Sequence, residues 1–131
     1  MQLTAAFIVA AASAATALAS PSLQARASPD NIGFGQQLQN TDQANHWVTW
    51  IDGESACPNT RLLGLLVNSP CGQQFSFNGF TFQLGDCGSD NFPRSLLDAN
   101  GGFIRSCASH TPKITCHGSE HDIIQHGRCD A

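Results

Sequence analysis

The C-terminal segment of this chain gathers the side chains whose types and spacing come closest to a chemical site. It contains His117, His121, His126, Glu120 and Asp122. On a helix, His117 and His121 would share one face and could bind zinc. However, Gly118 and Ser119 are poor helix formers, and the order His-Gly-Ser-Glu-His differs from the His-Glu-x-x-His zinc motif. We therefore expect surface histidines and no cofactor, and we keep a weak divalent-metal site at His117, His121 and His126 as an alternative.

Catalysis would need a nucleophile motif or a set of acid–base residues at a defined spacing. The chain has no Gly-x-Ser-x-Gly turn, and Glu54 and Glu120 are its only glutamates. A secreted ribonuclease can combine a glutamate base, a histidine acid and an arginine, and these residue types are present without a distinctive spacing. We assign no catalytic residue. A secreted hydrolase or a ribonuclease-like toxin that uses the histidine-rich C-terminal segment is the alternative.

Two tryptophans could form a platform on which a sugar ring stacks. Trp47 and Trp50 both lie in residues 46–51, where β-branched and aromatic residues predict a strand. The strand should end at the Asp52-Gly53 turn. An odd separation places the two indoles on opposite faces of a strand, so at most one can be exposed. We therefore expect core packing, with a carbohydrate-binding module as a further alternative.

The cysteines indicate a cross-linked extracellular protein. They are Cys57, Cys71, Cys87, Cys107, Cys116 and Cys129. An even number of cysteines in a short chain is typical of a disulfide framework formed in an oxidising compartment. We expect three intramolecular disulfides, and the spacing alone does not select among the possible pairings.

The first nineteen residues are mostly apolar and carry no charged side chain. They end in Ala17-Leu18-Ala19, the small-x-small pattern that precedes signal-peptide cleavage. The apolar run is shorter than the roughly 20 residues that cross a bilayer, and no second hydrophobic segment follows. We therefore predict a signal peptide over residues 1–19, a secreted extracellular protein, and no membrane attachment after cleavage.

The charge distribution argues against several classes of partner. The formal net charge is −4, Lys113 is the only lysine, and the five arginines are scattered. Tight nucleic-acid binding and electrostatic attachment to anionic membranes both rely on clustered Lys and Arg. We expect a monomer whose partner is an unidentified extracellular protein or glycan, and neither nucleic acid nor a membrane.

The chain beyond the signal peptide is long enough for one domain and too short for two independent cores. Residues 20–45 are polar and small, with Pro21, Pro29, Gly33 and Gly35 and little periodicity. This composition predicts a flexible polar leader. The folded part is then a single cysteine-rich β domain over residues 46–131.

Short apolar runs separated by turn residues predict an all-β fold. Besides residues 46–51, the expected strands are residues 62–67, 96–99, 103–105, 113–116 and 122–125. The Asn100-Gly101 turn predicts a hairpin between residues 96–99 and 103–105, and a short helix after Pro93 is the alternative there. Including the hairpin described next, we expect a small disulfide-stapled β-sandwich or barrel of about six to eight short strands.

The strongest local signal is the Asn78-Gly79 pair. A two-residue type I′ turn needs positive φ at both central positions, and Asn-Gly is the favoured pair there. That loop length sets Phe77 opposite Phe80 and Phe75 opposite Phe82. We expect the face that these phenylalanines share to be buried. The opposite face holds Gln74, Ser76, Thr81 and Gln83.

The same register bears on one disulfide. Extended outward, the ladder places Cys71 on the phenylalanine face and Cys87 on the opposite face. Side chains on opposite faces of a ladder cannot reach disulfide geometry unless a bulge intervenes or the strands part. The sequence pattern therefore disfavours a Cys71–Cys87 bridge.

Taken together, the Ala-rich signal sequence, the polar leader, the six cysteines and the Trp-x-x-Trp strand resemble the small secreted cysteine-rich proteins of filamentous fungi. Many members of that group are candidate effectors that act in the host apoplast. The resemblance implies a secreted, non-enzymatic, effector-like protein that acts by surface binding to a host or microbial partner. No residue role beyond the cysteines is carried over from it.

Overall fold

The computed structural model describes residues 30–131. The predicted signal peptide, residues 1–19, and the first part of the predicted leader lie outside the described residues. Residues 30–131 form strands and turns without a helix, and no helix in this range is long and apolar enough to cross a membrane.

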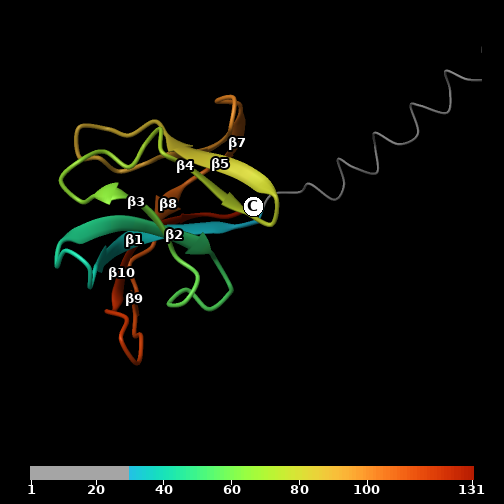
Figure 1. Cartoon of the computed structure of the whole chain (residues 1–131). Coiled ribbons are helices and arrows are strands. Elements are labelled where there is room, and N and C mark those ends of the chain that lie inside the picture. The colour runs from blue at the N-terminus through green and yellow to red at the C-terminus, as the bar shows by residue number, and fades with distance from the viewer. Residues whose placement is uncertain (1–29) are drawn as a thin grey trace, which may run out of the picture.

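The strands form two antiparallel sheets, which confirms the predicted disulfide-stapled all-β class (Figure 1). The larger sheet has the order β3-β2-β1-β10-β8, with β9 also paired to β10, and the smaller sheet has the order β4-β5-β6-β7. The strands are β1 Ile32–Leu38, β2 Asn45–Ile51, β3 Arg61–Leu65, β4 Gln74–Phe77, β5 Phe80–Gly85, β6 Ser95–Asp98, β7 Phe103–Ser106, β8 Ala108–Ser109, β9 Lys113–Ile114 and β10 Ile123–Cys129. The two sheets share one core, so the molecule is an open sandwich rather than a closed barrel.

Alternation along β2 buries side chains on both faces of the larger sheet. The core between the sheets contains Ile32, Phe34, Trp47, Ile51, Leu63, Phe75, Phe77, Phe82, Leu84, Leu96 and Cys129. Val48 and Trp50 point the other way and belong to a second buried cluster with Ala56, Cys116 and Ile123. Because successive strand residues face opposite sides, β2 contributes to both clusters.

The Asn78-Gly79 hairpin, formed by β4 and β5, has the predicted register. Phe75 pairs with Phe82 and Phe77 pairs with Phe80. The φ values of the two turn residues are 51° and 80°, as a type I′ turn requires. Phe75, Phe77 and Phe82 are buried, whereas Phe80 is only partly buried against the same core. The hairpin thus supplies one apolar face to the sandwich.

The other expected strands are found close to their predicted positions. Residues 46–51, 62–67, 113–116 and 122–125 correspond to β2, β3, β9 and β10. The predicted hairpin around Asn100-Gly101 is formed by β6 and β7, so the alternative of a short helix after Pro93 is wrong. The structure has more strands than expected because β1 and the two-residue strand β8 were not predicted.

The prediction of a flexible leader up to residue 45 is wrong for the segment Ile32–Leu38. This segment is β1, the strand between β2 and β10 in the larger sheet. Gly33 lies beneath the indole of Trp50, where an added Cβ would come within 2.6 Å of the ring. A glycine in a strand often marks such a close approach, and it weakens the sequence pattern of the strand. The folded domain therefore begins before residue 46.

The expectation against a Cys71–Cys87 bridge is also wrong, because these two cysteines form a disulfide. The β4–β5 ladder stops short of both cysteines. Gly72 and Asp86, with φ values of 86° and 54°, turn the chain away from the ladder on either side. The cysteine Cα atoms are 6.1 Å apart, within the usual range for a disulfide. The Gly72 N–H still donates to the Leu84 carbonyl at 3.0 Å, one residue out of the register that pairs Gln74 with Gln83. The two-face argument fails because this irregularity shifts the pairing beside Cys71.

The remaining disulfides join Cys57 to Cys116 and Cys107 to Cys129. All six cysteines are therefore paired, in agreement with the expectation from their even number. Cys107 directly follows β7 of the smaller sheet and Cys129 ends β10 of the larger sheet. This bridge ties the two layers of the sandwich together.

Candidate functional site

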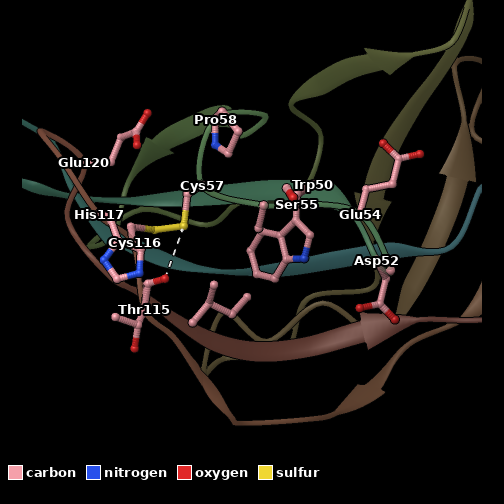
Figure 2. A pocket seen from close by; sticks show the side chains of 13 residues that line it. Trp50, Asp52, Glu54, Ser55, Cys57, Pro58, Thr115, Cys116, His117 and Glu120 are labelled. Atoms are coloured by element: carbon pink, nitrogen blue, oxygen red, sulfur yellow. Dashed lines mark hydrogen bonds between the residues drawn. A yellow bond between two sulfur atoms is a disulfide. The ribbon is translucent and has the colours of Figure 1, made fainter.

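A hollow of about 570 Å³ opens beside Trp50, on the face of the larger sheet that points away from the smaller sheet. Its volume lies within the range of small-ligand sites. Two segments far apart in the sequence form it, namely the turn after β2 and the segment after β9 (Figure 2). The lining residues are Trp50, Asp52, Gly53, Glu54, Ser55, Ala56, Cys57, Pro58, Ile114, Thr115, Cys116, His117 and Glu120.

The turn after β2 makes the first wall of the hollow. β2 ends at Ile51, and Gly53 has a φ of 99°, a left-handed conformation that glycine adopts without strain. The Glu54 N–H donates to the Ile51 carbonyl at 3.1 Å, and the Asn59 N–H donates to the Ala56 carbonyl at 2.9 Å. Two successive turns therefore present Glu54 to solvent beside the sheet.

The segment after β9 makes the second wall, and the Cys57–Cys116 disulfide joins it to the first. The Cys116 N–H donates to Asp122 Oδ1 at 2.8 Å, and Lys113 Nζ lies 3.1 Å from Asp122 Oδ2. The hydrogen bond from Cys116 and, to a lesser extent, the interaction with Lys113 hold the pKa of Asp122 below its ordinary value. The second wall is thus held in place by the Cys57–Cys116 disulfide and by the Asp122 carboxylate, which contacts both Cys116 and Lys113.

Trp50 forms the floor of the hollow. Its indole covers Gly33 and packs with Ala56, Cys116 and Ile123 in the second buried cluster. Only 2% of the surface of Trp50 is exposed. The floor is therefore rigid and apolar, and it offers no open aromatic face to a ligand.

The two tryptophans lie on opposite faces of β2, as their odd separation predicts. Trp47 is 5% exposed, and its indole N–H donates to the main-chain carbonyls of Leu66 and Asn68 at 3.2 and 3.0 Å. The expectation of core packing is confirmed for both tryptophans. A sugar-stacking platform built on either indole is contradicted by this burial.

Glu54 and Glu120 are the only glutamates of the chain, and both line the hollow. Both are exposed. Within residues 30–131, neither carboxylate has an ion pair or a side-chain hydrogen bond. Figure 2 shows them at opposite ends of the lining, with Cys57 and Pro58 between them. Glu54 and Glu120 are therefore two separate acidic groups of the hollow that have no salt-bridge partner among the described residues.

The lysine and arginine side chains of the described residues are engaged elsewhere. Arg61 lies 4.5 Å from the centre of the Phe77 ring, Arg94 pairs with Asp90 at 3.3 Å, Arg105 donates to Asn31 Oδ1 at 2.5 Å, Lys113 pairs with Asp122 at 3.1 Å, and Arg128 pairs with Asp130 at 3.0 Å. None of them lines the hollow. The negative potential at Glu54 and Glu120 is thus not neutralised by a lysine or arginine of the lining.

Asp52 lies at the edge of the hollow beside a second carboxylate. Burial raises the pKa of Asp52 above its ordinary value, and its hydrogen bond and charge repulsion with Asp130 raise the pKa further. Arg128 opposes this increase, with Nη1 3.9 Å from Asp52 Oδ2. Arg128 Nε also pairs with Asp130 Oδ2 at 3.0 Å. Asp52 is thus part of a charged junction between the turn after β2 and the end of β10.

The histidines of the C-terminal segment lie in different environments. His117 is exposed and lines the hollow. The main-chain carbonyl of His121 accepts a hydrogen bond from Gln37 Nε2 at 2.7 Å. His126 packs against Trp47 with ring centres 5.1 Å apart, and burial lowers its pKa. Across residues 30–131, no group of three or more His, Cys, Asp or Glu side chains is placed to hold a metal ion.

Sequence reasoning singled out His117 and Glu120 but did not connect them with Glu54. The connection depends on the Cys57–Cys116 bridge, whose partners are 59 residues apart. Cysteine spacing does not reveal such a pairing. The Asp52-Gly53 turn was the signal in the sequence that a loop begins at this point.

Comparison of the chain with protein-family models, with curated proteins and with solved structures gave no match. The functional proposal therefore depends on the chemistry of the hollow and of the frame around it.

Proposed function

We propose that this protein is a secreted, non-enzymatic, effector-like protein that binds an extracellular partner through the hollow. One observation carries the proposal. The hollow of about 570 Å³ is walled by two exposed loops that a disulfide fastens to each other above a two-sheet frame. Loops held on a rigid scaffold are a common location of binding function.

The disulfides support both the compartment and the mode of action. Three disulfides are typical of extracellular proteins. The Cys57–Cys116 bridge also limits how far the two walls can move apart. A preformed site loses less conformational entropy on binding than a flexible one, so more of the contact energy contributes to affinity.

A second candidate function, a secreted hydrolase or ribonuclease-like toxin, is favoured by one specific observation. His117 and Glu120 line the same hollow, and these residue types serve as general acid and base. No hydrogen bond joins their side chains within residues 30–131, and no arginine is among the lining residues. These facts favour binding over catalysis.

The test of the proposed function is to block the hollow. Ser55 is exposed in the first wall, and Ser55→Trp would fill the space between the walls. Ser89→Trp makes the same change at an exposed position outside the lining. Immobilised wild-type protein and Ser89→Trp should capture the same partner from extracellular host fluid, and Ser55→Trp should not.

Two results would contradict this proposal. Capture of the same partner by Ser55→Trp would place binding outside the hollow. Turnover of RNA, a cell-wall polysaccharide or an ester that disappears in His117→Ala would favour the enzymatic candidate.

The mass of the purified secreted protein also tests its processing, because the predicted signal cleavage after Ala19 leaves Ser20 as the first residue.

A further inference from the structure

We propose that the hollow binds basic side chains of an extended segment of a partner protein, with Glu54 and Glu120 each receiving one lysine or arginine. This inference rests on the proposed function, which supplies an extracellular protein as the partner. The first observation is that both glutamates of the chain line one hollow and are exposed. Two carboxylates at opposite ends of one lining match a ligand with two separated positive groups (Figure 2).

The second observation concerns the charges around the hollow. Lys113 is held by Asp122, and Arg128 is held by Asp130 and lies near Asp52. Among the described residues, no lysine or arginine lines the hollow to neutralise Glu54 or Glu120, and His117 is the only basic side chain in the lining. A carboxylate without a counter-charge attracts an incoming cation and repels an anion, so the charge selects the sign of the ligand.

The third observation is the apolar stretch between the two carboxylates. Ala56, Pro58 and Ile114 line the hollow together with the Cys57–Cys116 bridge. Lysine and arginine carry long aliphatic stems that pack along apolar surfaces while their charged ends remain solvated. Basic side chains therefore match both the ends of the hollow and its middle. A metal ion would match only the carboxylates, and these are not grouped for one.

The experiment measures binding of a short lysine peptide to the folded protein with its disulfides intact. The probe is acetyl-Lys-Ala-Ala-Ala-Lys-amide, whose two lysines point to the same side of an extended chain, and it is titrated by calorimetry at low ionic strength. The comparison probes are acetyl-Glu-Ala-Ala-Ala-Glu-amide and the free amine spermidine. We expect the lysine peptide to bind, the glutamate peptide not to bind, and the affinity to fall as salt is added, because exposed charge pairs are screened.

Matched variants separate the two glutamates from the overall charge of the protein. Glu54→Gln and Glu120→Gln should each weaken binding of the lysine peptide by about two- to fivefold, and the double variant by about tenfold. The control is Asp42→Asn with Asp90→Asn, which removes two exposed negative charges outside the hollow. The control should bind the peptide as the wild type does.

The outcomes that would contradict the proposal differ for the glutamates, for the kind of ligand and for the hollow itself. Failure of the lysine peptide to bind at about 1 mM, or an equal loss in the control, would overturn the role of the glutamates. Binding of spermidine without binding of the peptide would show a site for small amines instead of a partner protein. If Ser55→Trp abolishes partner capture and the Glu54/Glu120 double variant does not, this inference fails while the proposed function stands. If Ser55→Trp retains capture, the proposed function itself fails.

Discussion

At the scale of single residues, His126 couples the fold to pH. Its ring packs against Trp47, and its Nε2 lies 2.9 Å from Gln36 Oε1, where the neutral imidazole can donate a hydrogen bond. Burial disfavours the charged imidazolium and lowers the pKa of His126 below 6.5. The unfolded chain therefore binds this proton at a higher pH than the folded chain does.

The resulting prediction concerns stability between about pH 7.5 and pH 5. When the pKa of a histidine is lower in the folded state than in the unfolded state, folding is most stable at a pH above the unfolded-state pKa. This stability is lost as the pH falls through the folded-state pKa, because the unfolded chain then binds more protons. The free energy of unfolding of the wild type should therefore decrease on acidification, and this slope should be smaller in His126→Gln. Urea denaturation at several pH values measures the free energy of unfolding and hence this slope.

The control for this prediction is His117→Gln, which removes an exposed imidazole from the rim of the hollow. It should keep the slope of the wild type. Equal slopes in His126→Gln and the wild type would show that His126 does not carry the pH dependence.

At the scale of elements, the β4–β5 hairpin shows how a local rule controls which residues are buried. The two-residue turn sets the pairing of Phe75 with Phe82, and the pleat then puts both rings on one face. These rings stack with centres 5.6 Å apart. Ser76, on the other face, makes only an exposed hydrogen bond with Thr81 at 2.9 Å.

We predict that the two faces of this hairpin differ sharply in their sensitivity to mutation. Phe82→Ala should lower the free energy of unfolding by about 3–5 kcal/mol, because it leaves a cavity at a fully buried position. Ser76→Ala should change it by about 0.5 kcal/mol or less. Denaturant unfolding with the disulfides intact measures both values, and similar small losses would contradict the observed register.

At the scale of the whole molecule, the three disulfides close loops of different lengths. The partners of Cys57–Cys116 are 59 residues apart, and those of Cys71–Cys87 are 16 residues apart. Loop-closure entropy removed from the unfolded chain increases with the length of the closed loop. The longer bridge should therefore contribute more to stability, besides holding the two walls of the hollow together.

The prediction compares two double variants. Cys57→Ala with Cys116→Ala should lower the free energy of unfolding by about 4 kcal/mol, and Cys71→Ala with Cys87→Ala by about 3 kcal/mol. Guanidinium unfolding of both proteins provides the comparison. The order would be reversed if strain in the folded protein, rather than the unfolded chain, dominated the effect. The first variant should also lose partner capture, because its walls are no longer joined.

The sequence by itself determined the features that depend on neighbouring residues. The Asn78-Gly79 turn and the alternation beside it were sufficient for the register of the hairpin, because a two-residue loop leaves one pairing. The run of β-branched and aromatic residues likewise identified β2 and the opposite orientation of Trp47 and Trp50. The even cysteine count indicated a complete set of disulfides.

Only the tertiary structure decided the features that depend on distant partners. β1 is a strand because β2 and β10 enclose it, although its own glycines weaken any local pattern. Cys71 reaches Cys87 because the register of the pairing shifts beside Gly72, beyond the regular β4–β5 ladder. Glu54 and Glu120 line one hollow although they are far apart in the sequence, and the Cys57–Cys116 bridge joins the two segments that carry them. Contacts of this kind form between segments far apart in the chain, so no short stretch of sequence encodes them.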